Sequence, residues 1–443
     1  MKIGIIDVQN SKKLSINKDL VGGLGQIWEV GNSFFSRVIS YIRRKKVKLP
    51  VLSLAYIQAI LKEKKIYVKY FEDLPLKNED FDVFFIYGSM IDYQNENNFA
   101  VKLKQKFPDS KVGFIGPFPS RYPEYFKADF VIVGEPESFF LYQFYTDKNK
   151  YKRIIKTKKI IKMDDLPTPD FSGFPIKQYS YFPALNKKPV LTLQASRGCP
   201  YSCSYYCAYG AYQGSKYRKR SPEKIINDIK TLIKKHNVKS IQFRDPTFGL
   251  DKKQIGGLCD LIIDNKIKID WGIETRMDLL NFKFIKKMAD AGLKNINVGI
   301  ETIDDNIAKV NKRGLDKKNH QEEIVKFCKK IGVKISAFYI FGYKGDNKET
   351  IKRLIDYSLK LNTIGARFAI NTPFPGTFFY EELKKEGKIK NFNLKDYNSF
   401  CLVFEHENLN LKDLNELKEI AFIKYYFRPR YILEFLKWKI REF

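Results

Sequence analysis

The sequence predicts an α/β protein built from two successive parallel sheets, and three observations support this. Strand and helix patterns alternate over residues 1–150, they alternate again in six units from Val190 onward, and a proline-punctuated segment separates the two series. Such alternation is typical of parallel sheets, because parallel strands need a crossover connection that is usually a helix. The first series indicates a doubly wound, Rossmann-like domain, and the second indicates an open (β/α)6 partial barrel.

In residues 1–150, apolar periodicity predicts five short strands with helices between them. The expected strands are Lys2–Asp7, Ile66–Phe71, Asp82–Tyr87, Lys111–Ile115 and Phe130–Val133, and the expected helices are Ser33–Lys45, Val51–Lys64 and Asn98–Phe107. Ligands of doubly wound sheets bind beyond the carboxyl ends of the strands. Small or polar residues at those ends would let the backbone approach a large flat ligand: Gly23, Gly25, Ser89, Gly116, Gly134 and Glu135.

Residues 151–188 are expected to be a connector, because a lysine-rich stretch there gives way to Leu166-Pro167-Thr168-Pro169-Asp170. Residues 189–405 should form the barrel and residues 406–443 a short helical tail. Ser221 as N-cap and Pro222 at the first helical position mark the first barrel helix clearly. The expected barrel strands are Val190–Gln194, Ser240–Arg244, Ile269–Ile273, Asn295–Gly299, Lys334–Ile340 and Ala366–Ile370, and the expected tail helices are Leu411–Phe427 and Tyr431–Phe443.

Cys199, Cys203 and Cys207 lie within nine residues, directly after the first barrel strand. Thiolates suit iron–sulfur clusters, zinc and copper(I). Structural zinc sites usually have four protein ligands, and the next Cys or His along the chain is His236. We therefore interpret the three cysteines as ligands to three irons of a [4Fe–4S] cluster whose fourth iron stays open; a zinc knuckle and a chance cluster are the alternatives. Cys259, Cys328 and Cys401 are isolated in sequence and are expected to be core residues.

The net charge of +30 raises the question of nucleic-acid binding. The lysines are spread through every segment rather than gathered in one, so the composition does not favour a nucleic-acid partner. The N-terminus has the pattern of a strand rather than of a signal peptide, and no apolar run reaches the ~20 residues needed to span a bilayer. A reducing, cytoplasmic location is expected.

The run Ser196-Arg197-Gly198-Cys199-Pro200-Tyr201-Ser202-Cys203, followed by an aromatic residue and Cys207, resembles the cluster loop of radical S-adenosylmethionine (SAM) enzymes. It is most similar to the subfamily with an N-terminal cobalamin (B12)-binding domain, whose interdomain link the Leu-Pro-x-Pro-Asp segment also resembles. The usual spacing there is Cys-x3-Cys-x2-Cys, whereas this chain has Cys-x3-Cys-x3-Cys. We expect a local bulge to absorb the extra residue.

The resemblance implies that SAM chelates the open iron and is cleaved reductively to a 5′-deoxyadenosyl radical, with electrons from a flavodoxin- or ferredoxin-type donor. It also implies SAM contacts at the strand ends, where the alternative is ordinary solvated loop residues. Glu274 and Glu301 would accept hydrogen bonds from the ammonium group or ribose, and Arg276 would pair with the carboxylate. The full set of implied SAM contacts is Tyr206 (beside the adenine), Asp245, Glu274, Arg276, Gly299, Glu301 and Gly342. Tyr209, Tyr212, Phe374 and Arg367 are candidates for substrate binding, with a core or surface role as the alternative for each.

The resemblance further implies cobalamin at the carboxyl edge of the first sheet, so the six residues named there become its candidate contacts. Many corrinoid domains carry Asp-x-His-x-x-Gly after the first strand, but this chain has Asp7-Val8-Gln9-Asn10 and no histidine before His236. Either the corrin is held without a histidine ligand, or the domain has lost the cofactor.

The implied function is cobalamin-dependent methylation of an unactivated carbon in a small-molecule or lipid-like biosynthetic substrate. A radical cyclisation or rearrangement without methyl transfer is the alternative among enzymes. Two further alternatives belong to other functional classes. The chain could be a basic RNA-binding or RNA-modifying protein, or a sensor that binds the cofactors without catalysis. Methylthiotransferases would need an N-terminal cysteine trio, and no cysteine precedes Cys199. The tail mixes aromatic and basic residues, which indicates either packing against the barrel or a partner, or peripheral membrane contact.

Overall fold

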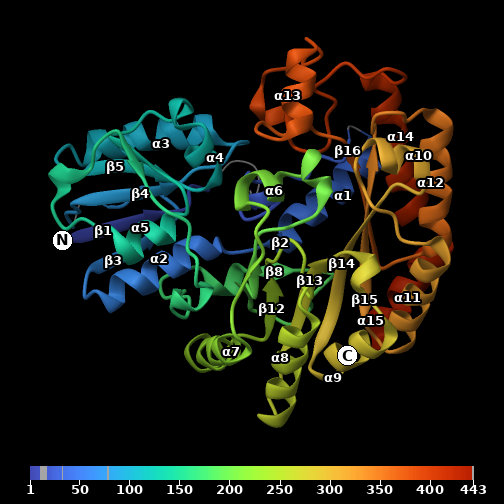
Figure 1. Cartoon of the computed structure of the whole chain (residues 1–443), viewed down its shortest axis with the longest axis horizontal. Helices are drawn as coiled ribbons and strands as arrows, with labels where there is room; N and C mark the ends of the chain where they lie inside the picture. Colours follow the sequence, from blue (N-terminus) through green and yellow to red (C-terminus); the bar gives the residue numbers. More distant parts are fainter. Residues whose placement is uncertain (10–16, 32, 77–78, 442–443) are drawn as a thin grey trace.

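The computed structural model describes residues 1–9, 17–31, 33–76 and 79–441, and contains two six-stranded parallel sheets (Figure 1). The first sheet has the order β3-β1-β4-β5-β6-β7, and its strands are all parallel. Its strands are β1 (Lys2–Ile6), β3 (Tyr67–Phe71), β4 (Val83–Tyr87), β5 (Lys111–Ile115), β6 (Phe130–Val133) and β7 (Ile154–Lys156). The five predicted strands are present, and β7 adds a sixth from the segment that was expected to be a connector.

The helices beside the first sheet are α2 (Leu52–Glu63), α3 (Tyr93–Lys106), α4 (Pro117–Arg121) and α5 (Pro136–Tyr142). Helix α3 begins five residues before the predicted start at Asn98. Its first turns bury Glu96 and Asn97 rather than apolar side chains, so hydrophobic periodicity gives no signal there. The sheet order reverses at β1 and β4, which is the switch point where doubly wound folds bind their ligands.

The predicted helix near residues 33–45 exists as α1 (Phe34–Lys46), but it packs away from the first sheet, against the tail. The ring centroids of Phe35 and Phe427 lie 4.7 Å apart, and Arg43 donates a hydrogen bond to the Tyr426 hydroxyl at 3.2 Å. The first 50 residues therefore reach across to the second half of the chain.

The second sheet has the order β16-β15-β14-β13-β12-β9, again all parallel, and forms the predicted open partial barrel. Its strands are β9 (Val190–Leu193), β12 (Ser240–Phe243), β13 (Asp270–Thr275), β14 (Leu293–Glu301), β15 (Lys334–Phe341) and β16 (Gly365–Ile370). The helices outside it are α7 (Pro222–His236), α8 (Lys252–Asp264), α9 (Phe282–Asp290), α10 (Asp305–Val310), α11 (Lys318–Lys330) and α12 (Lys348–Leu361).

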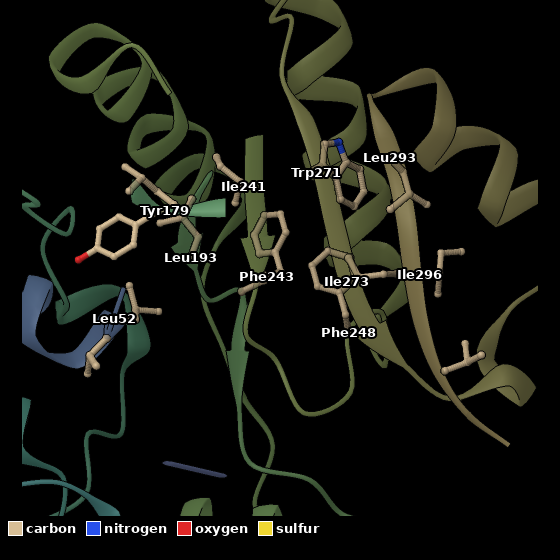
Figure 2. Packing of buried hydrophobic residues seen from close by; sticks show 14 of the residues in the cluster. Leu52, Tyr179, Leu193, Ile241, Phe243, Phe248, Trp271, Ile273, Leu293 and Ile296 are labelled. Carbon is tan, nitrogen blue, oxygen red and sulfur yellow. The ribbon is translucent and has the colours of Figure 1, made fainter. Parts of the chain in front are cut away.

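The core of this region is built from aromatic and branched side chains of β12, β13 and β14 (Figure 2). Phe243 lies 4.9 Å from Phe248 and 5.8 Å from Trp271, measured between ring centroids. The Trp271 indole N–H donates to the Ala291 carbonyl at 2.8 Å, so its buried donor is satisfied. Cys259 and Cys328 are fully buried in the same core, as predicted.

The tail contains α14 (Leu411–Tyr426) and α15 (Pro429–Arg441), while Phe443, the predicted end of the last helix, lies outside the described residues. Tyr431 and Phe435 of α15 pack against the core of the barrel region, and Lys334 lies 4.0 Å above the Trp438 ring. The opposite face exposes Ile432, Leu433 and Leu436. Among the helices that the structure describes, none is long and apolar enough to cross a membrane.

Candidate active site

The cysteine loop is held by a small antiparallel hairpin. β10 (Ser196–Arg197) pairs with β11 (Arg218–Lys219), and the Cys199 N–H donates to the Gly214 carbonyl at 3.0 Å. Gly198 has a φ of +91°, and a Cβ at this position would lie 2.2 Å from the Lys216 carbonyl oxygen. Glycine is therefore required directly before the first cysteine, where the two arms of the loop approach each other.

The extra residue between Cys203 and Cys207 is accommodated by a single 3-10 turn over Ser202–Tyr205. The Cys207 N–H donates to the Cys203 carbonyl at 2.9 Å, which closes the turn. The turn sends the two tyrosines in different directions. Tyr205 donates to Glu382 of α13 (Phe378–Lys385) at 2.9 Å, whereas Tyr206 lines the central cavity with its ring centroid 5.1 Å from that of Tyr343. Of the two tyrosines, only Tyr206 is placed to meet a ligand in this cavity.

A cavity of about 280 Å³ extends from the three cysteines into the barrel. Five of the seven predicted SAM contacts line it: Tyr206, Glu274, Arg276, Gly299 and Glu301. Within the described residues, no three Cys, His, Asp or Glu side chains converge on a position for a single metal ion. In an iron–sulfur cluster the thiolates bind separate irons.

The thiols are protected from water to different degrees. Cys203 is buried, and Cys199 and Cys207 are half-buried. Burial raises the pKa of Cys203 and of Cys207 above the ordinary thiol value. Both thiols are therefore neutral at pH 7 without a metal, and cluster binding would have to displace their protons.

Glu301 has the most constrained geometry of the cavity. It stands at a register shift of β14 against β15 and has a φ of +69°, which is rare for a residue other than glycine. Its carboxylate folds back over Gly299, where a Cβ would lie 2.0 Å from Oε1. One carboxylate oxygen, Oε2, is buried and accepts no hydrogen bond from the described residues. Strained backbone and unsatisfied polar atoms cluster at ligand sites.

Three arginines lie near this carboxylate. Burial raises the pKa of Glu301, while Arg313, Arg367 and Arg276 act in the opposite direction. Arg313 donates from Nη2 to the Gly299 carbonyl at 2.6 Å, and its Nε has no hydrogen-bond partner within the described part of the chain. The sequence analysis missed Arg313, which follows α10 (Asp305–Val310) and is adjacent to Gly314; nothing in its local sequence directs it to the cavity.

Arg276 and Glu274 already have protein partners. Arg276 bonds to Asp278 at 2.7 Å and lies 4.1 Å from the centre of the Tyr201 ring, and Glu274 pairs with Arg244 at 2.6 Å. Asp278 thus orients the Arg276 guanidinium, and Arg244 orients the Glu274 carboxylate, at the wall of the cavity.

Asp245 and Gly342 do not line the cavity. Asp245 is buried and accepts hydrogen bonds from the Ala195 N–H at 3.0 Å and the Ser196 hydroxyl at 2.5 Å, so it anchors the base of the cysteine loop. Gly342 has a φ of +79° and lies against Leu414 of α14. Both follow barrel strands, as predicted, but they face the protein interior.

The six residues predicted at the edge of the first sheet separate into two groups. Gly23, Gly134 and Glu135 line a second cavity of about 330 Å³, together with residues of the cysteine loop. Ser89 is buried and bonds to Glu96, Gly25 lies against Ile91 and Ser89, and Gly116 packs on Gly88 and Tyr87. These last three do not face the second cavity.

Residues 17–26 lie over the carboxyl ends of β1, β4 and β5. Lys18 is buried at the switch point, where its ammonium group lies 3.2 Å from Asp7, 3.0 Å from Glu96 and 3.3 Å from the Tyr87 carbonyl. Burial alone would lower the pKa of Lys18, but Glu96 and Asp7 raise it above its ordinary value. At Gly23, a Cβ would lie 2.4 Å from Pro117, so this segment is packed tightly onto α4.

Four charged residues join the first domain to the cysteine loop. Glu135 binds Arg218 through two hydrogen bonds at 2.6 and 3.0 Å, and Glu137 pairs with Arg197 at 3.2 Å. We call these four residues the interdomain clamp. Glu135, predicted as a cofactor contact, therefore has its carboxylate engaged by the hairpin that carries the cysteines.

A parallel partial barrel whose strand ends face a loop of three cysteines defines a class of enzymes that use an iron–sulfur cluster. Residues 193–358 match the model of the radical SAM superfamily. The barrel region therefore contains a radical SAM domain over these residues.

Relatives and solved structures agree with this assignment. The chain is 26% identical to an uncharacterised methyltransferase of Pyrococcus horikoshii over 66% of its own length and 62% of that protein, so the match spans less than two thirds of this relative. It is 22% identical to the bacteriochlorophyllide d C-12(1)-methyltransferase of Chlorobaculum tepidum, over 78% of this chain and 75% of that one.

Two solved structures share the fold of both domains. The cobalamin-dependent radical SAM enzyme OxsB superposes with a TM-score of 0.67 at 15% identity, covering 100% of this chain and 71% of OxsB. The radical SAM methyltransferase TsrM from Kitasatospora setae superposes with a TM-score of 0.62 at 14% identity, covering 87% of this chain and 76% of TsrM. The first domain and the barrel are thus arranged as in cobalamin-dependent radical SAM enzymes.

Proposed function

We propose that this chain is a radical SAM enzyme that holds a [4Fe–4S] cluster through Cys199, Cys203 and Cys207 and methylates an unactivated carbon of a small biosynthetic molecule. The observation that carries the proposal is a cavity that begins at three cysteines and is lined by an unsatisfied carboxylate and arginines. The bound cluster would supply the electron that cleaves SAM into methionine and a 5′-deoxyadenosyl radical. A cytoplasmic, reducing location and a flavodoxin- or ferredoxin-type donor belong to this proposal.

The residues of the cavity would bind and orient SAM. The Glu301 carboxylate would accept hydrogen bonds from the ammonium group or the ribose, and Arg276 would pair with the SAM carboxylate. Tyr206 would lie against the adenine. Once SAM fills the cavity, the lining side chains would limit the access of water to the reacting atoms, which protects reactive intermediates from side reactions.

The test is anaerobic reconstitution with iron and sulfide, followed by reduction in the presence of SAM. We expect an iron–sulfur absorbance band and formation of 5′-deoxyadenosine. A protein that takes up iron and sulfide but never cleaves SAM would contradict the catalytic proposal and favour a sensor.

Methyl transfer, rather than cyclisation or rearrangement, is favoured by the named methyltransferases among the relatives. It is not the only chemistry among them, because the anaerobic magnesium-protoporphyrin IX monomethyl ester cyclase of Rubrivivax gelatinosus is 26% identical over 59% of this chain. Mass spectrometry of the product would distinguish the two, because methyl transfer adds one carbon to the substrate and cyclisation or rearrangement adds none.

Cobalamin, when bound, would supply the methyl group, and we propose the carboxyl edge of the first sheet as its site. The second cavity, of about 330 Å³, is suited to a drug-sized molecule and does not fit a corrin with its side chains while residues 17–26 stay in place. Binding would therefore require this segment to move off the strand ends. Glu135 and Ser89 are engaged within the protein through side-chain and backbone groups, so Gly23 and Gly134 are the predicted contacts left to face the ligand.

Cobalamin binding should therefore increase hydrogen exchange in residues 17–26, whose backbone bonds, such as Gly25 N–H to Leu20 carbonyl at 3.2 Å, would open. Mass spectrometry with and without one equivalent of cobalamin measures this. In the Co(II) form we also expect an electron paramagnetic resonance spectrum without nitrogen splitting, because the sequence has no histidine before His236. Unchanged exchange in a saturated complex would rule out the displacement, and absence of binding would indicate that the domain has lost the cofactor.

We also propose that the outer face of α15 contacts anionic membrane surfaces. Ile432, Leu433 and Leu436 are exposed there, beside the exposed Arg430 and Lys437. Apolar and basic residues on one helix face suit an anionic bilayer interface. Changing the three apolar residues together to serine should reduce sedimentation with phosphatidylglycerol-containing vesicles about tenfold or more.

The control for the membrane test is Phe392→Ser, which removes an even more exposed apolar side chain elsewhere. It should leave vesicle binding unchanged. Equal binding of the wild-type protein to neutral and anionic vesicles, or no binding to either, would contradict the proposed role of α15.

A further inference from the structure

Arg367 is a half-buried arginine, and no carboxylate lies within ion-pair distance of it among the described residues. It stands in the middle of β16 and lines the central cavity. Its Nε is buried without a hydrogen-bond partner in the described part of the chain. Burying a charge is costly unless it is paired. The missing partner is therefore the feature that needs an explanation.

The side chains stacked around the Arg367 guanidinium are aromatic rings. The centre of its guanidinium lies 5.3 Å from the Trp28 ring, 5.5 Å from Phe400 and 5.8 Å from Phe338. Rings at this distance hold a guanidinium by cation–π attraction, but they accept no strong hydrogen bond from its N–H groups. Burial lowers the pKa of Arg367 to about 10, although Glu274 and Glu301 act in the opposite direction from beyond ion-pair distance.

The acidic residues of the cavity have other cations beside them. Glu274 is paired with Arg244 at 2.6 Å. Burial raises the pKa of Glu301, and Arg313 is the cation that most strongly acts in the opposite direction. Arg276 lies 4.1 Å from the centre of the Tyr201 ring, and the residue before Arg313 accepts a hydrogen bond from the Ser202 hydroxyl at 2.9 Å, so both arginines lie beside the cysteine loop. They are accordingly the arginines available to the SAM carboxylate, and Arg367 is left for a different anion.

We propose that Arg367 binds a carboxylate of the substrate, so that the enzyme acts on a carboxylic acid with an apolar or aromatic body. This inference rests on the proposed function and specifies the substrate class of the same cavity. A guanidinium has planar N–H groups that match the two oxygens of a carboxylate. The apolar body is expected because Phe338, Ile340 and Phe374 line the cavity as well.

The experiment measures binding of benzoate and of benzamide to the full-length reconstituted protein by ligand-observed nuclear magnetic resonance. The two probes have the same shape and differ in charge. The wild-type protein should bind benzoate about tenfold or more tightly than benzamide, since hydrogen bonds to a charged group are the strong ones. Arg367→Met should remove this preference.

Arg43→Met is the matched control, because Arg43 lines the same cavity but already donates to Tyr426 at 3.2 Å. It should keep the benzoate preference within about twofold. Arg367→Met should also melt no lower than the wild type, because it removes an uncompensated buried charge. Benzoate should raise the thermal midpoint of the wild type and leave that of Arg367→Met unchanged.

SAM affinity, measured on the same samples, separates this inference from the proposed function. We expect Arg367→Met to bind SAM as the wild type does, and a tenfold loss would assign Arg367 to the SAM carboxylate and overturn the inference. Equal binding of the two probes, no benzoate binding, or a preference that survives Arg367→Met would also overturn it. If the wild type fails to bind SAM, the proposed function is wrong, and the benzoate result still decides the role of Arg367.

Discussion

Replacing Cys207 by alanine should abolish both the iron–sulfur absorbance and the formation of 5′-deoxyadenosine. Cys207 closes the 3-10 turn that absorbs the extra residue of the cysteine spacing, and its side chain lines the central cavity with those of Cys199 and Cys203. Two thiolates would hold the cluster too weakly for it to survive reduction. Iron content, visible absorbance and product formation after anaerobic reconstitution measure the effect.

The control for this substitution is Cys401→Ala, which removes a half-buried thiol that does not line the cavity. It should keep both the cluster and SAM cleavage. A Cys207→Ala protein with a normal cluster and normal activity would show that the third ligand has been assigned wrongly.

Glu301→Gln should weaken SAM binding roughly 10- to 150-fold, the equivalent of one charge-assisted hydrogen bond of ~1.5–3 kcal/mol. Glutamine keeps the shape that fits over Gly299 and removes the charge. The thermal midpoint should stay unchanged or rise, because Oε2 of Glu301 is buried without a partner in the described residues. Calorimetric titration with SAM and thermal unfolding of the same sample test both expectations.

Glu274→Gln is the comparison variant, because its effect on the thermal midpoint should differ from that of Glu301→Gln. The Glu274 carboxylate pairs with the buried Arg244 at 2.6 Å, so this change should lower the thermal midpoint clearly. If Glu301→Gln also lowered the midpoint while SAM affinity stayed the same, Glu301 would be structural, and its proposed role would have to be abandoned.

Local patterns in the sequence predicted much of this molecule. A barrel strand is predicted by an apolar run of a few neighbouring residues, and the cluster loop by the spacing of Cys199 and Cys203. The structure contains each predicted strand. The position of a residue at the end of a strand predicted less well whether its side chain lines the cavity. Asp245 follows β12 and Glu301 ends β14, yet Asp245 turns back to Ser196 at 2.5 Å while Glu301 faces the cavity. Sequence position does not say to which side a strand-end residue turns.

Long-range contacts could not be predicted at all. Trp28 lies 5.3 Å from Arg367, although more than 300 residues separate them in the chain. The same holds for α1, whose amphipathic pattern predicted a helix but not that it packs on the tail. A single sequence contains no local signal for such pairs, because they depend on how the two sheets are arranged.

The interdomain clamp limits how the chain can be divided or recombined. Arg197 and Arg218 are almost fully buried, and their partners Glu135 and Glu137 belong to the other domain. A barrel produced without residues 1–150 would lose both carboxylates that hold the hairpin, and within the intact chain removing one partner of such a buried pair costs about 3–5 kcal/mol. A chimera that takes its first domain from a relative must therefore supply acidic residues at both positions to keep the cysteine hairpin folded. The clamp therefore couples the two sheets, although each is hydrogen-bonded separately.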